Sequence, residues 1–481
     1  MNLKQLLHSK KLCVVVVAIA TTMMMVSCAG DGFDDESYGS SVKNTQLSSP
    51  SENDINVTAS ADGSMTIISW PVVRGAGGYH AILTNTTTNE IEVDTIIDGV
   101  SFAAKRAEDT NYSISVLTLG NRNLGNTEAS TPTVKTFTTF TPAYATIPNG
   151  SDLYQYFQEN TIPEVDDNGD GVADEVYYDL EPNGNYTVSN ILDFNAHSVT
   201  LRTSDKLARA TVTYGEGASI TYCAGLGLKY IKFDVSASTN PVFAFSSNPT
   251  IEADVNHNNY HQITTPTIIS SCDFEGVQSY FLYDNKIKYC LKTFMMNDCR
   301  VHLTLSTTTV SSNAIFQIYD GQGFINDITF KNSTIWNTGE KDCKYFIRYH
   351  NSCRCDRAGY ATNSINYINC TLYNIAKTGQ MGNYSGFDGR ATSNYNVENC
   401  IFVDCGNAQV ARRIVARLGT GAIAFNNNTY EFNGELNDQS GYDTGNILTT
   451  APGLADPLNG NLTPSGAEQV SMKTGDPYWY K

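Results

Sequence analysis

The sequence predicts an all-β protein in which an N-terminal β-sandwich is followed by a parallel β-helix. The chain is rich in Tyr, Thr, Asn and Gly and only 17% of its residues are charged, a composition that favours strands and turns over helices. Short alternating segments separated by turns fill residues 55–140, as in a sandwich. Related segments then recur about every 30 residues, which indicates a solenoid.

The N-terminus has the parts of a secretory signal. Three lysines precede an apolar run over residues 12–25, and small residues then lead to Cys28. The apolar run is too short and too unevenly flanked for a good transmembrane helix. We expect residues 1–27 to be a lipoprotein signal peptide and Cys28 to be the lipidated first residue of the mature chain. The alternative is cleavage elsewhere, which would leave Cys28 without a role.

Residues 28–53 are rich in Ser, Asn, Gly and Asp and contain little that builds a core, so we expect a flexible tether. The acidic stretch from Asp31 to Glu36 resembles the surface-export signal of outer-membrane lipoproteins in bacteria of the Bacteroidetes type. This resemblance implies a protein that is lipid-anchored in the outer membrane and faces outward from the cell.

The charge balance argues against nucleic acid as a partner. Removal of residues 1–27 takes away three lysines and no acidic residue, so the net charge changes from −18 to −21. A protein that binds a phosphate backbone needs a basic face. We therefore expect no nucleic-acid partner for the mature chain.

Residues 54–140 contain five short alternating segments, the first of which is INVTAS and the last TVKTFTT. Trp70 lies in ISWPVV and Tyr112 in TNYSISVLT. The segment resembles a fibronectin type III domain, whose core tryptophan and tyrosine corner these two residues match. The resemblance implies a spacer domain.

Residues 141–150 are expected to be a linker, because TTFTPAYATIP has no helical or strand pattern that continues. The segment SDLYQYFQEN follows, and Ser151 or Asp152 can cap a short helix with Leu153 on its apolar face. We expect this helix to cap the β-helix, which would extend from residue 151 to 481.

The β-helix prediction rests on relatives of the segment INYINCTLYN. Stacked coils of this kind bury one row of side chains along the solenoid. Cysteine behaves as a small apolar residue in such a row, so we interpret the central cysteines as core residues rather than nucleophiles. Asn369 and Asn399 are expected to form a hydrogen-bonded ladder at the bend. The segments are centred on Cys272, Cys299, Ser333, Cys370, Cys400 and Asn428.

Three further cysteines, Cys343, Cys353 and Cys355, are less constrained by the repeat. An exported protein meets an oxidising environment, so these residues are candidates for a disulfide or for free thiols in a loop. Their irregular spacing and the lack of an accompanying His pair give a zinc site little support.

The motif DDNGDGVADE places oxygen ligands at alternate positions around a glycine, which predicts a Ca²⁺ site. A tyrosine occupies the position of the last carboxylate of an EF-hand, so the motif resembles the open D-x-N-x-D-G-x-x-D loops. The ion would have a structural role, and the alternative is a bare acidic turn. The candidate ligands are Asp166, Asn168, Asp170, Val172 through its carbonyl group, and Asp174.

The segment from Lys341 to Arg417 is basic although the chain is acidic, with ten basic and five acidic residues. Arginine binds carboxylates through paired hydrogen bonds, and aromatic faces pack on sugar rings, so this segment predicts a site for an acidic polysaccharide. The alternative is a set of solvated loop charges that pair with nearby acids. The candidate glycan-binding residues are Arg348, Arg354, Arg357, Arg390, Arg412, Arg413, Tyr349 and Tyr360.

The repeated N-x-C/S strands and the ending TAPGLADPLNGNLTPSGAEQ…GDPYWY resemble the right-handed β-helix lipoproteins of Bacteroidetes carbohydrate-utilisation loci. Those proteins carry the domain-of-unknown-function families 4957 and 5123 and are related in fold to pectate lyases. The resemblance covers residue 151 to the C-terminus. It implies a cell-surface lipoprotein that binds a polysaccharide, acidic and pectin-like, near an outer-membrane glycan uptake complex.

Two other functions stay open at this point. A pectate-lyase-like polysaccharide lyase would use an Arg or Lys base with Ca²⁺ held by several acidic residues, whereas Asp356 and Asp388 are isolated in the sequence. A non-catalytic scaffold for partner proteins is the second alternative. The sequence identifies no catalytic residue, and we favour binding over catalysis.

Overall fold

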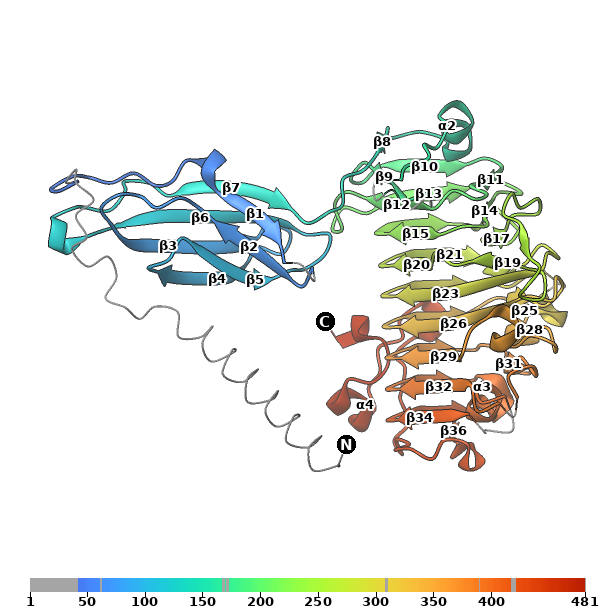
Figure 1. The fold of residues 1–481 in the computed structure, drawn as a ribbon. Coiled ribbons are helices and arrows are strands. Elements are labelled where there is room, and N and C mark those ends of the chain that lie inside the picture. Colours follow the sequence, from blue (N-terminus) through green and yellow to red (C-terminus); the bar gives the residue numbers. More distant parts are fainter. Residues whose placement is uncertain are drawn as a thin grey trace, which may run out of the picture. The chain divides into compact units, whose positions relative to one another are not determined.

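The computed structural model describes residues 42–60, 63–166, 169, 173–307, 310–388, 390–416 and 421–480 (Figure 1). Cys28 and the predicted signal peptide lie outside these residues. The chain divides into two compact units, residues 1–141 and residues 142–481, which are described separately. Among the described residues, no helix is long and apolar enough to span a membrane.

The first unit is a sandwich of two antiparallel sheets, which confirms the predicted fibronectin type III-like fold. Its two short 3-10 helices are η1 (Glu52–Asp54) and η2 (Arg122–Leu124). One sheet has the order β1 (Asn56–Ala59), β2 (Met65–Ser69), β5 (Ser101–Lys105). The other has the order β4 (Glu90–Ile97), β3 (Ala76–Asn85), β6 (Asn111–Gly120), β7 (Thr133–Thr138).

The two aromatic residues that indicated this fold lie in its core. Trp70 is buried edge-on against Tyr79, with 5.5 Å between the ring centroids. Tyr112 is buried and stacks on Phe137 at 5.2 Å. The core also includes Leu47. The sandwich therefore begins before residue 54, and the predicted tether of residues 28–53 extends too far toward the C-terminus. That part of the chain is fixed because it pairs with the loop after β6, where the Thr127 amide donates to Thr45 O at 3.0 Å.

The second unit is a parallel β-helix made of three long sheets (Figure 1). Successive coils up to β31 add a strand to each sheet, the first and second sheets continue beyond it, and neighbouring strands are parallel except at β18–β19 and β35–β36. The first sheet contains β8 (Ala145–Ile147), β9 (Val176–Leu180), β12 (Val199–Thr203), β15 (Leu226–Lys229), β18 (Ala253–Asp254), β19 (Tyr260–Ile263), β20 (Thr267–Ser270), β23 (Tyr289–Asn297), β26 (Phe324–Lys331), β29 (Asn363–Ile368), β32 (Ser393–Glu398) and β34 (Ala422–Asn426).

The other two sheets complete each coil. The second sheet contains β10 (Asn185–Val188), β13 (Ala210–Tyr214), β16 (Ile231–Asp234), β21 (Asp273–Val277), β24 (Arg300–Leu303), β27 (Thr334–Asn337), β30 (Thr371–Tyr373), β33 (Ile401–Val403), β35 (Thr429–Phe432) and β36 (Glu435–Leu436). The third sheet contains β11 (Ile191–Asp193), β14 (Ser219–Tyr222), β17 (Phe243–Phe245), β22 (Leu282–Tyr283), β25 (Ala314–Ile318), β28 (Tyr345–Tyr349) and β31 (Gln380–Asn383).

Short helices stand at the ends and turns of this unit. The predicted capping helix is α2 (Leu153–Glu159), whose N-cap Asp152 accepts a hydrogen bond from the Gln155 amide. The predicted linker of residues 141–150 is shorter than expected, because β8 pairs with β9 and begins the first sheet. The remaining helices are α3 (Val410–Ile414), α4 (Ala467–Met472), η3 (Val310–Ser312), η4 (Cys355–Ala358), η5 (Gly406–Ala408), η6 (Gln439–Gly441), η7 (Pro457–Asn459) and η8 (Pro477–Tyr480).

The bend between the first and second sheets carries the predicted asparagine ladder. Asn369 has a left-handed backbone (φ 51°), a conformation that asparagine tolerates well. Its side-chain amide donates to Asn332 Oδ1 at 2.9 Å, and its Oδ1 accepts from Asn399 at 3.1 Å. The complete ladder joins Asn297, Asn332, Asn369, Asn399, Asn427 and Asn446.

Beside the ladder, Cys272, Cys299, Cys370 and Cys400 are buried free thiols, which agrees with their predicted place in the core. Burial raises the pKa of the Cys272 thiol to about 12. A thiol with so high a pKa is a poor nucleophile at neutral pH. Cys343, Cys353 and Cys355 are likewise buried free thiols.

The ladder yields a stability prediction. We expect Asn369→Gly, which keeps the left-handed backbone, to lower the free energy of unfolding by about 1.5 kcal/mol, because two side-chain hydrogen bonds are lost. Urea denaturation followed by circular dichroism measures the change. Asn433→Gly is the control: this exposed asparagine has the same left-handed backbone (φ 52°) but lies outside the ladder, so its replacement should leave the urea midpoint unchanged. An unchanged urea midpoint in Asn369→Gly would show that the ladder adds nothing to stability.

Candidate functional site

The outward side chains of the third sheet align in register as a row along the axis of the β-helix, with Asp193 exposed, Tyr283, Arg348 and Asn383 half-buried, and Thr221, Ala244 and Gln317 buried beneath their neighbours. The register of its parallel strands aligns one outward residue from each coil, and adjacent strands lie about 4.8 Å apart. Two hollows lie along this row, one near each end. The row consists of Asp193, Thr221, Ala244, Tyr283, Gln317, Arg348 and Asn383. We call it the third-sheet row.

The first hollow, called here the tyrosine hollow, has a volume of about 430 Å³. Tyr280 and Tyr283 line it and stack on each other, with ring centroids 4.8 Å apart and an interplanar angle of 12°. Its other lining residues are mostly hydroxyl and amide side chains from β11, β14 and the turns before β17 and after β22. Aromatic rings combined with a few placed polar groups are typical of a ligand site.

The second hollow, called here the amide hollow, has a volume of about 370 Å³. It lies where the coil after β31 replaces a third-sheet strand by α3, and the Tyr384 hydroxyl ties the two together by donating to Ile414 O at 2.7 Å. Gly382 is required beside this ring, because a Cβ at residue 382 would come within 2.3 Å of it. The lining side chains include Asn351, Gln380, Asn383, Ser385 and Arg413.

Arg348 lies on the row between the two hollows. Its guanidinium carbon is 3.7 Å from the ring centroid of Tyr319 and 5.1 Å from that of Tyr345. Its Nη1 donates to Asn313 Oδ1 at 3.2 Å, and Asn313 Nδ2 donates to the Tyr280 hydroxyl at 3.0 Å. Asn313 therefore connects Arg348 to the tyrosine hollow.

Two carboxyl groups lie behind the tyrosine hollow. Asp284 is completely buried and accepts hydrogen bonds from the backbone amides of Lys286 and Gly321. Burial raises the pKa of Asp284 to about 7, although these hydrogen bonds act in the opposite direction. Asp320 accepts from Gln317 Nε2 at 3.2 Å. Together with burial, these two carboxyl groups raise the pKa of the Tyr283 hydroxyl.

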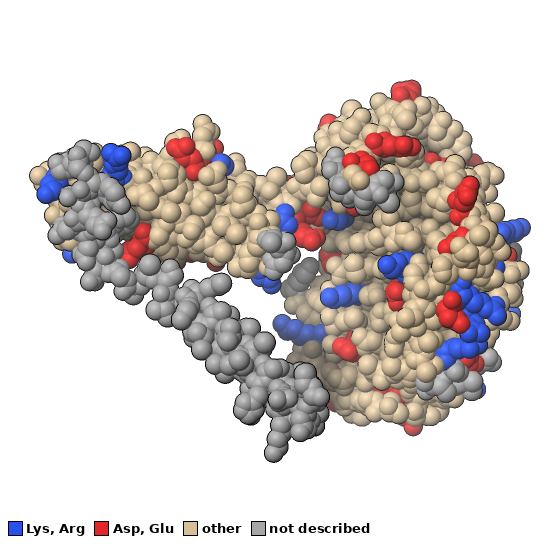
Figure 2. Space-filling model, in the orientation of Figure 1, with Lys and Arg blue, Asp and Glu red and all other residues tan. Residues whose placement is uncertain are grey.

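The residues predicted from the basic segment are only partly brought together. Figure 2 shows lysine and arginine side chains gathered at the edge of the β-helix unit near β25 and β28. Tyr349 is completely buried in the core, so its prediction as a surface contact for sugar is wrong. The side chain of residue 349 points inward because it follows Arg348 in a strand, where successive side chains alternate between faces. Tyr360 is half-buried and its hydroxyl donates to Gln262 Oε1 at 3.2 Å.

The remaining predicted arginines mostly contact nearby protein groups. Arg354 pairs with Asp356, with 2.8 Å between Nε and Oδ1, and Arg357 donates to Ser352 O at 3.1 Å. Arg412 donates to Gln409 Oε1 at 2.9 Å. Burial acts to raise the pKa of Asp356, but the hydrogen bond and charge of Arg354 lower it, and the charge of Arg390 adds to this effect. Of the predicted arginines, Arg348 thus belongs to the third-sheet row and Arg413 to the amide hollow.

The sequence-based prediction missed the tyrosine hollow. Tyr280 and Tyr283 precede the basic segment by about two coils, or roughly 60 residues, and only the register of the coils places Tyr283 on the same row as Arg348. The sequence does contain an indication of this hollow, the pair of tyrosines in SYFLYD. This segment follows β21, the strand that comes after the bend at Cys272. A coil-by-coil alignment of the repeats would have identified it.

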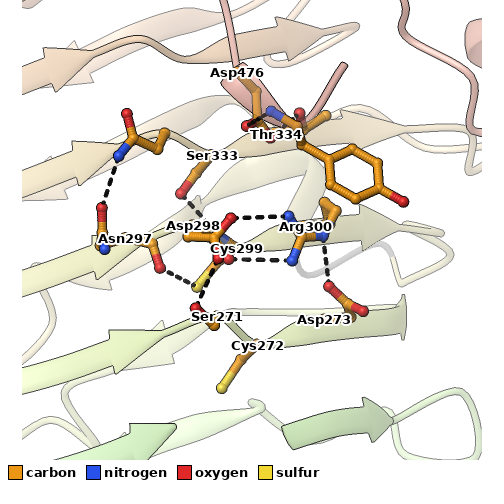
Figure 3. Close-up of polar contacts among 12 residues, drawn as sticks. Ser271, Cys272, Asp273, Asn297, Asp298, Cys299, Arg300, Ser333, Thr334 and Asp476 are labelled. Atoms are coloured by element: carbon orange, nitrogen blue, oxygen red, sulfur yellow. Dashed lines mark hydrogen bonds and ion pairs between the residues drawn. The ribbon is translucent and has the colours of Figure 1, made fainter. Parts of the chain in front are cut away.

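A second polar cluster lies on the outer face of the second sheet, and Figure 3 shows it. Arg300 donates to Asp273 at 2.6 Å and pairs with Asp298 at 3.3 Å. Asp476, near the C-terminus, accepts from the Thr334 hydroxyl at 2.7 Å. These groups bind one another and hold the C-terminal segment GDPYWY on β24 and β27, so this cluster is structural.

The predicted calcium loop falls largely outside the described residues. Asn168, Asp170 and Val172 are not described, and only Asp166 and Asp174 are. Within the described residues, no group of three or more His, Cys, Asp and Glu side chains is arranged to hold a metal ion. The calcium site stays a prediction.

Comparisons with known proteins identify two domains. Residues 1–183 match DUF4992 and residues 184–338 match DUF4957, each described as a domain of unknown function. No curated protein matches the chain. A solved pectate lyase, PelI from Erwinia chrysanthemi in complex with tetragalacturonic acid, is 9% identical over 73% of this chain and 88% of its own, with a TM-score of 0.11. That likeness is too weak to carry an argument.

The boundary between the two matched domains lies between β9 and β10, inside the β-helix. DUF4992 thus includes the sandwich together with α2 and the first strands of the solenoid. The predicted match to family 4957 is confirmed, whereas the resemblance to family 5123 and the lipoprotein features stay predictions. The chain therefore contains a DUF4992 domain over residues 1–183 and a DUF4957 domain over residues 184–338.

Proposed function

We propose that this protein binds an acidic polysaccharide along the third-sheet row. The observation that carries the proposal is the alignment on one sheet of a hollow lined by stacked tyrosines and a hollow lined by amides, with the half-buried Arg348 in register between them. Aromatic rings pack against the apolar faces of sugars, and hydroxyl and amide groups form hydrogen bonds with sugar hydroxyl groups. Arginine adds a partner for carboxylate or sulfate.

The shape of the row fits a polymer better than a small molecule. Asp193 and Asn383 are six strand steps apart, so the row extends over about 29 Å. A ligand that reached both hollows would be an extended chain lying parallel to the axis of the β-helix. Binding over such a length lets several weak contacts add up to a useful affinity.

The cellular setting that we propose follows from the N-terminal sequence. Cys28 carries the lipid, and the acidic stretch after it directs the protein to the outer face of the outer membrane, where it captures glycan for an uptake complex. Replacing Cys28 by alanine should release the protein from the membrane fraction into the soluble fraction. Retention of the variant in the membrane fraction would contradict the lipid anchor.

Affinity electrophoresis tests the binding function. The mature protein is run through gels that contain polygalacturonate, alginate, a glycosaminoglycan or a neutral glucan, and we expect retardation by at least one acidic polymer. Unretarded migration in every gel would favour a protein scaffold. The same mixtures are followed at the absorbance of unsaturated uronates, and product formation would replace binding with lyase activity.

Calcium is part of the proposal as a structural ion at residues 166–174. We expect titration calorimetry to show one binding event in the parent protein and none in Asp170→Ala, because the variant lacks a central carboxylate ligand. Asp205→Ala, in the turn between β12 and β13, is the control and should bind like the parent. Equal heats in the parent and Asp170→Ala would contradict the site.

A further inference from the structure

Positive and negative side chains are unevenly distributed along the third-sheet row. The end of the row that contains Arg348 carries positive charge. Among the described residues, no carboxylate lies within ion-pair distance of Arg348, whose hydrogen-bonding partner is the neutral Asn313. The Nε atom of Arg348 is buried and has no hydrogen-bond partner among the described residues. The guanidinium group is therefore held in place by rings and an amide rather than neutralised.

Two more basic side chains, His350 and Lys288, lie near Arg348. The imidazole of His350 is 5.3 Å from the ring of Tyr319, on which Arg348 stacks. Burial lowers the pKa of His350, and the charges of Lys288 and Arg348 lower it further. The Ser352 amide donates to His350 Nδ1 at 3.3 Å, so in the neutral ring Nε2 carries the proton. Lys288 donates to the neutral Asn258 O at 2.6 Å.

The other end of the row is neutral to acidic. Of the described residues that line the tyrosine hollow, Asp193 is the charged one, and it is exposed. Asp284 and Asp320 lie close enough to Tyr283 to act on its hydroxyl group. A carboxylate or sulfate placed in this hollow would lie beside the exposed carboxylate of Asp193, with no cation among the described lining residues, which is unfavourable.

The two regions are separated along the axis. Tyr283 and Arg348 are two strand steps apart through Gln317, which is about 10 Å. A chain with an anionic group on every sugar would place some of those groups against Asp193. A chain whose anionic groups are spaced by neutral sugars would match both regions.

From this asymmetry we infer that the ligand is a heteropolysaccharide in which neutral sugars separate the anionic ones, with an anion subsite at Arg348, His350 and Lys288 and a neutral subsite in the tyrosine hollow. This inference rests on the proposed function and narrows its substrate class. It disfavours homopolyuronates, which the resemblance to pectate lyases had implied.

Titration calorimetry with four polymers of defined composition tests the inference. Polygalacturonate carries a carboxylate on every sugar, hyaluronan and the rhamnogalacturonan backbone alternate uronate with a neutral sugar, and dextran is neutral. We expect at least one alternating polymer to bind at least tenfold more tightly than polygalacturonate. We further expect Arg348→Gln to lower that affinity at least tenfold and to weaken its dependence on salt.

Two further variants control for folding and for general charge. Arg348→Lys keeps the charge but not the planar group and should show an intermediate loss. Arg122→Gln removes the same charge from the sandwich unit and should bind like the parent. Polygalacturonate binding as tightly as the alternating polymers, or unchanged affinity in Arg348→Gln, would overturn the inference. Binding of dextran alone would overturn the anion subsite but keep glycan binding, whereas no binding of any polymer would overturn the proposed function itself.

Discussion

Replacement of Tyr283 by alanine is expected to weaken glycan binding by about 2 kcal/mol, or roughly 30-fold in Kd. The tyrosine ring lines the tyrosine hollow and stacks on Tyr280, so the variant removes the central apolar contact from this end of the third-sheet row. Titration calorimetry with the polymer that retards the parent protein measures the loss.

Tyr283→Phe separates the ring from its hydroxyl group. Because the variant keeps the ring, we expect it to retain most of the affinity, while an unchanged melting temperature in both variants would exclude unfolding as the cause. If Tyr283→Ala bound as tightly as the parent, the tyrosine hollow would have no part in binding.

The second large effect concerns pH and the C-terminal segment. Asp476 is buried, and burial raises its pKa from 3.8 to about 6, although Thr334, the Tyr478 amide and Arg300 act in the opposite direction. A raised folded-state pKa contributes stability that is complete at about pH 4 and is lost as the pH rises through 6. Relative to Asp476→Asn, which cannot ionise, the parent should lose about 2.4 kcal/mol of unfolding free energy between pH 4 and pH 7.5.

Urea denaturation at the two pH values, followed by the fluorescence of Trp336 and Trp479, measures this difference. Thr334→Val is the control, because it removes a hydrogen bond that lowers the pKa of Asp476 but leaves the titrating group in place, so it should destabilise the protein and keep a pH dependence at least as large as that of the parent. A difference between parent and Asp476→Asn that is the same at both pH values would show that Asp476 does not titrate in this range.

The sequence was sufficient for the parts of the fold that repeat. Each bend between the first and second sheets needs a residue that tolerates a left-handed backbone and a small buried neighbour, so Asn369 and Cys370 recur in recognisable form in other coils. Trp70 and Tyr112 identified the sandwich in the same way. Such local requirements are visible in one sequence without any knowledge of register.

The third-sheet row could not be predicted in this way. Coils differ in length, so the alignment of Tyr283 with Arg348 depends on strand pairing, and the insertion that forms β18 and β19 shifts the spacing between Ala244 and Tyr283. The inward orientation of Tyr349 could not be predicted for the same reason, because a shift of one residue in the register exchanges the two faces of a strand. The pairing of β8 with β9 is a long-range contact that a linker-like composition conceals.

Oxidative footprinting of the mature protein, with and without a saturating polysaccharide, tests the central claim most directly. Mass spectrometry reports the rate at which each tyrosine is oxidised. We predict that the polysaccharide slows oxidation of Tyr283 and Tyr319 and leaves the exposed Tyr478, on the second sheet, unchanged. Protection of Tyr478 without protection of Tyr283 would contradict glycan binding along the third-sheet row.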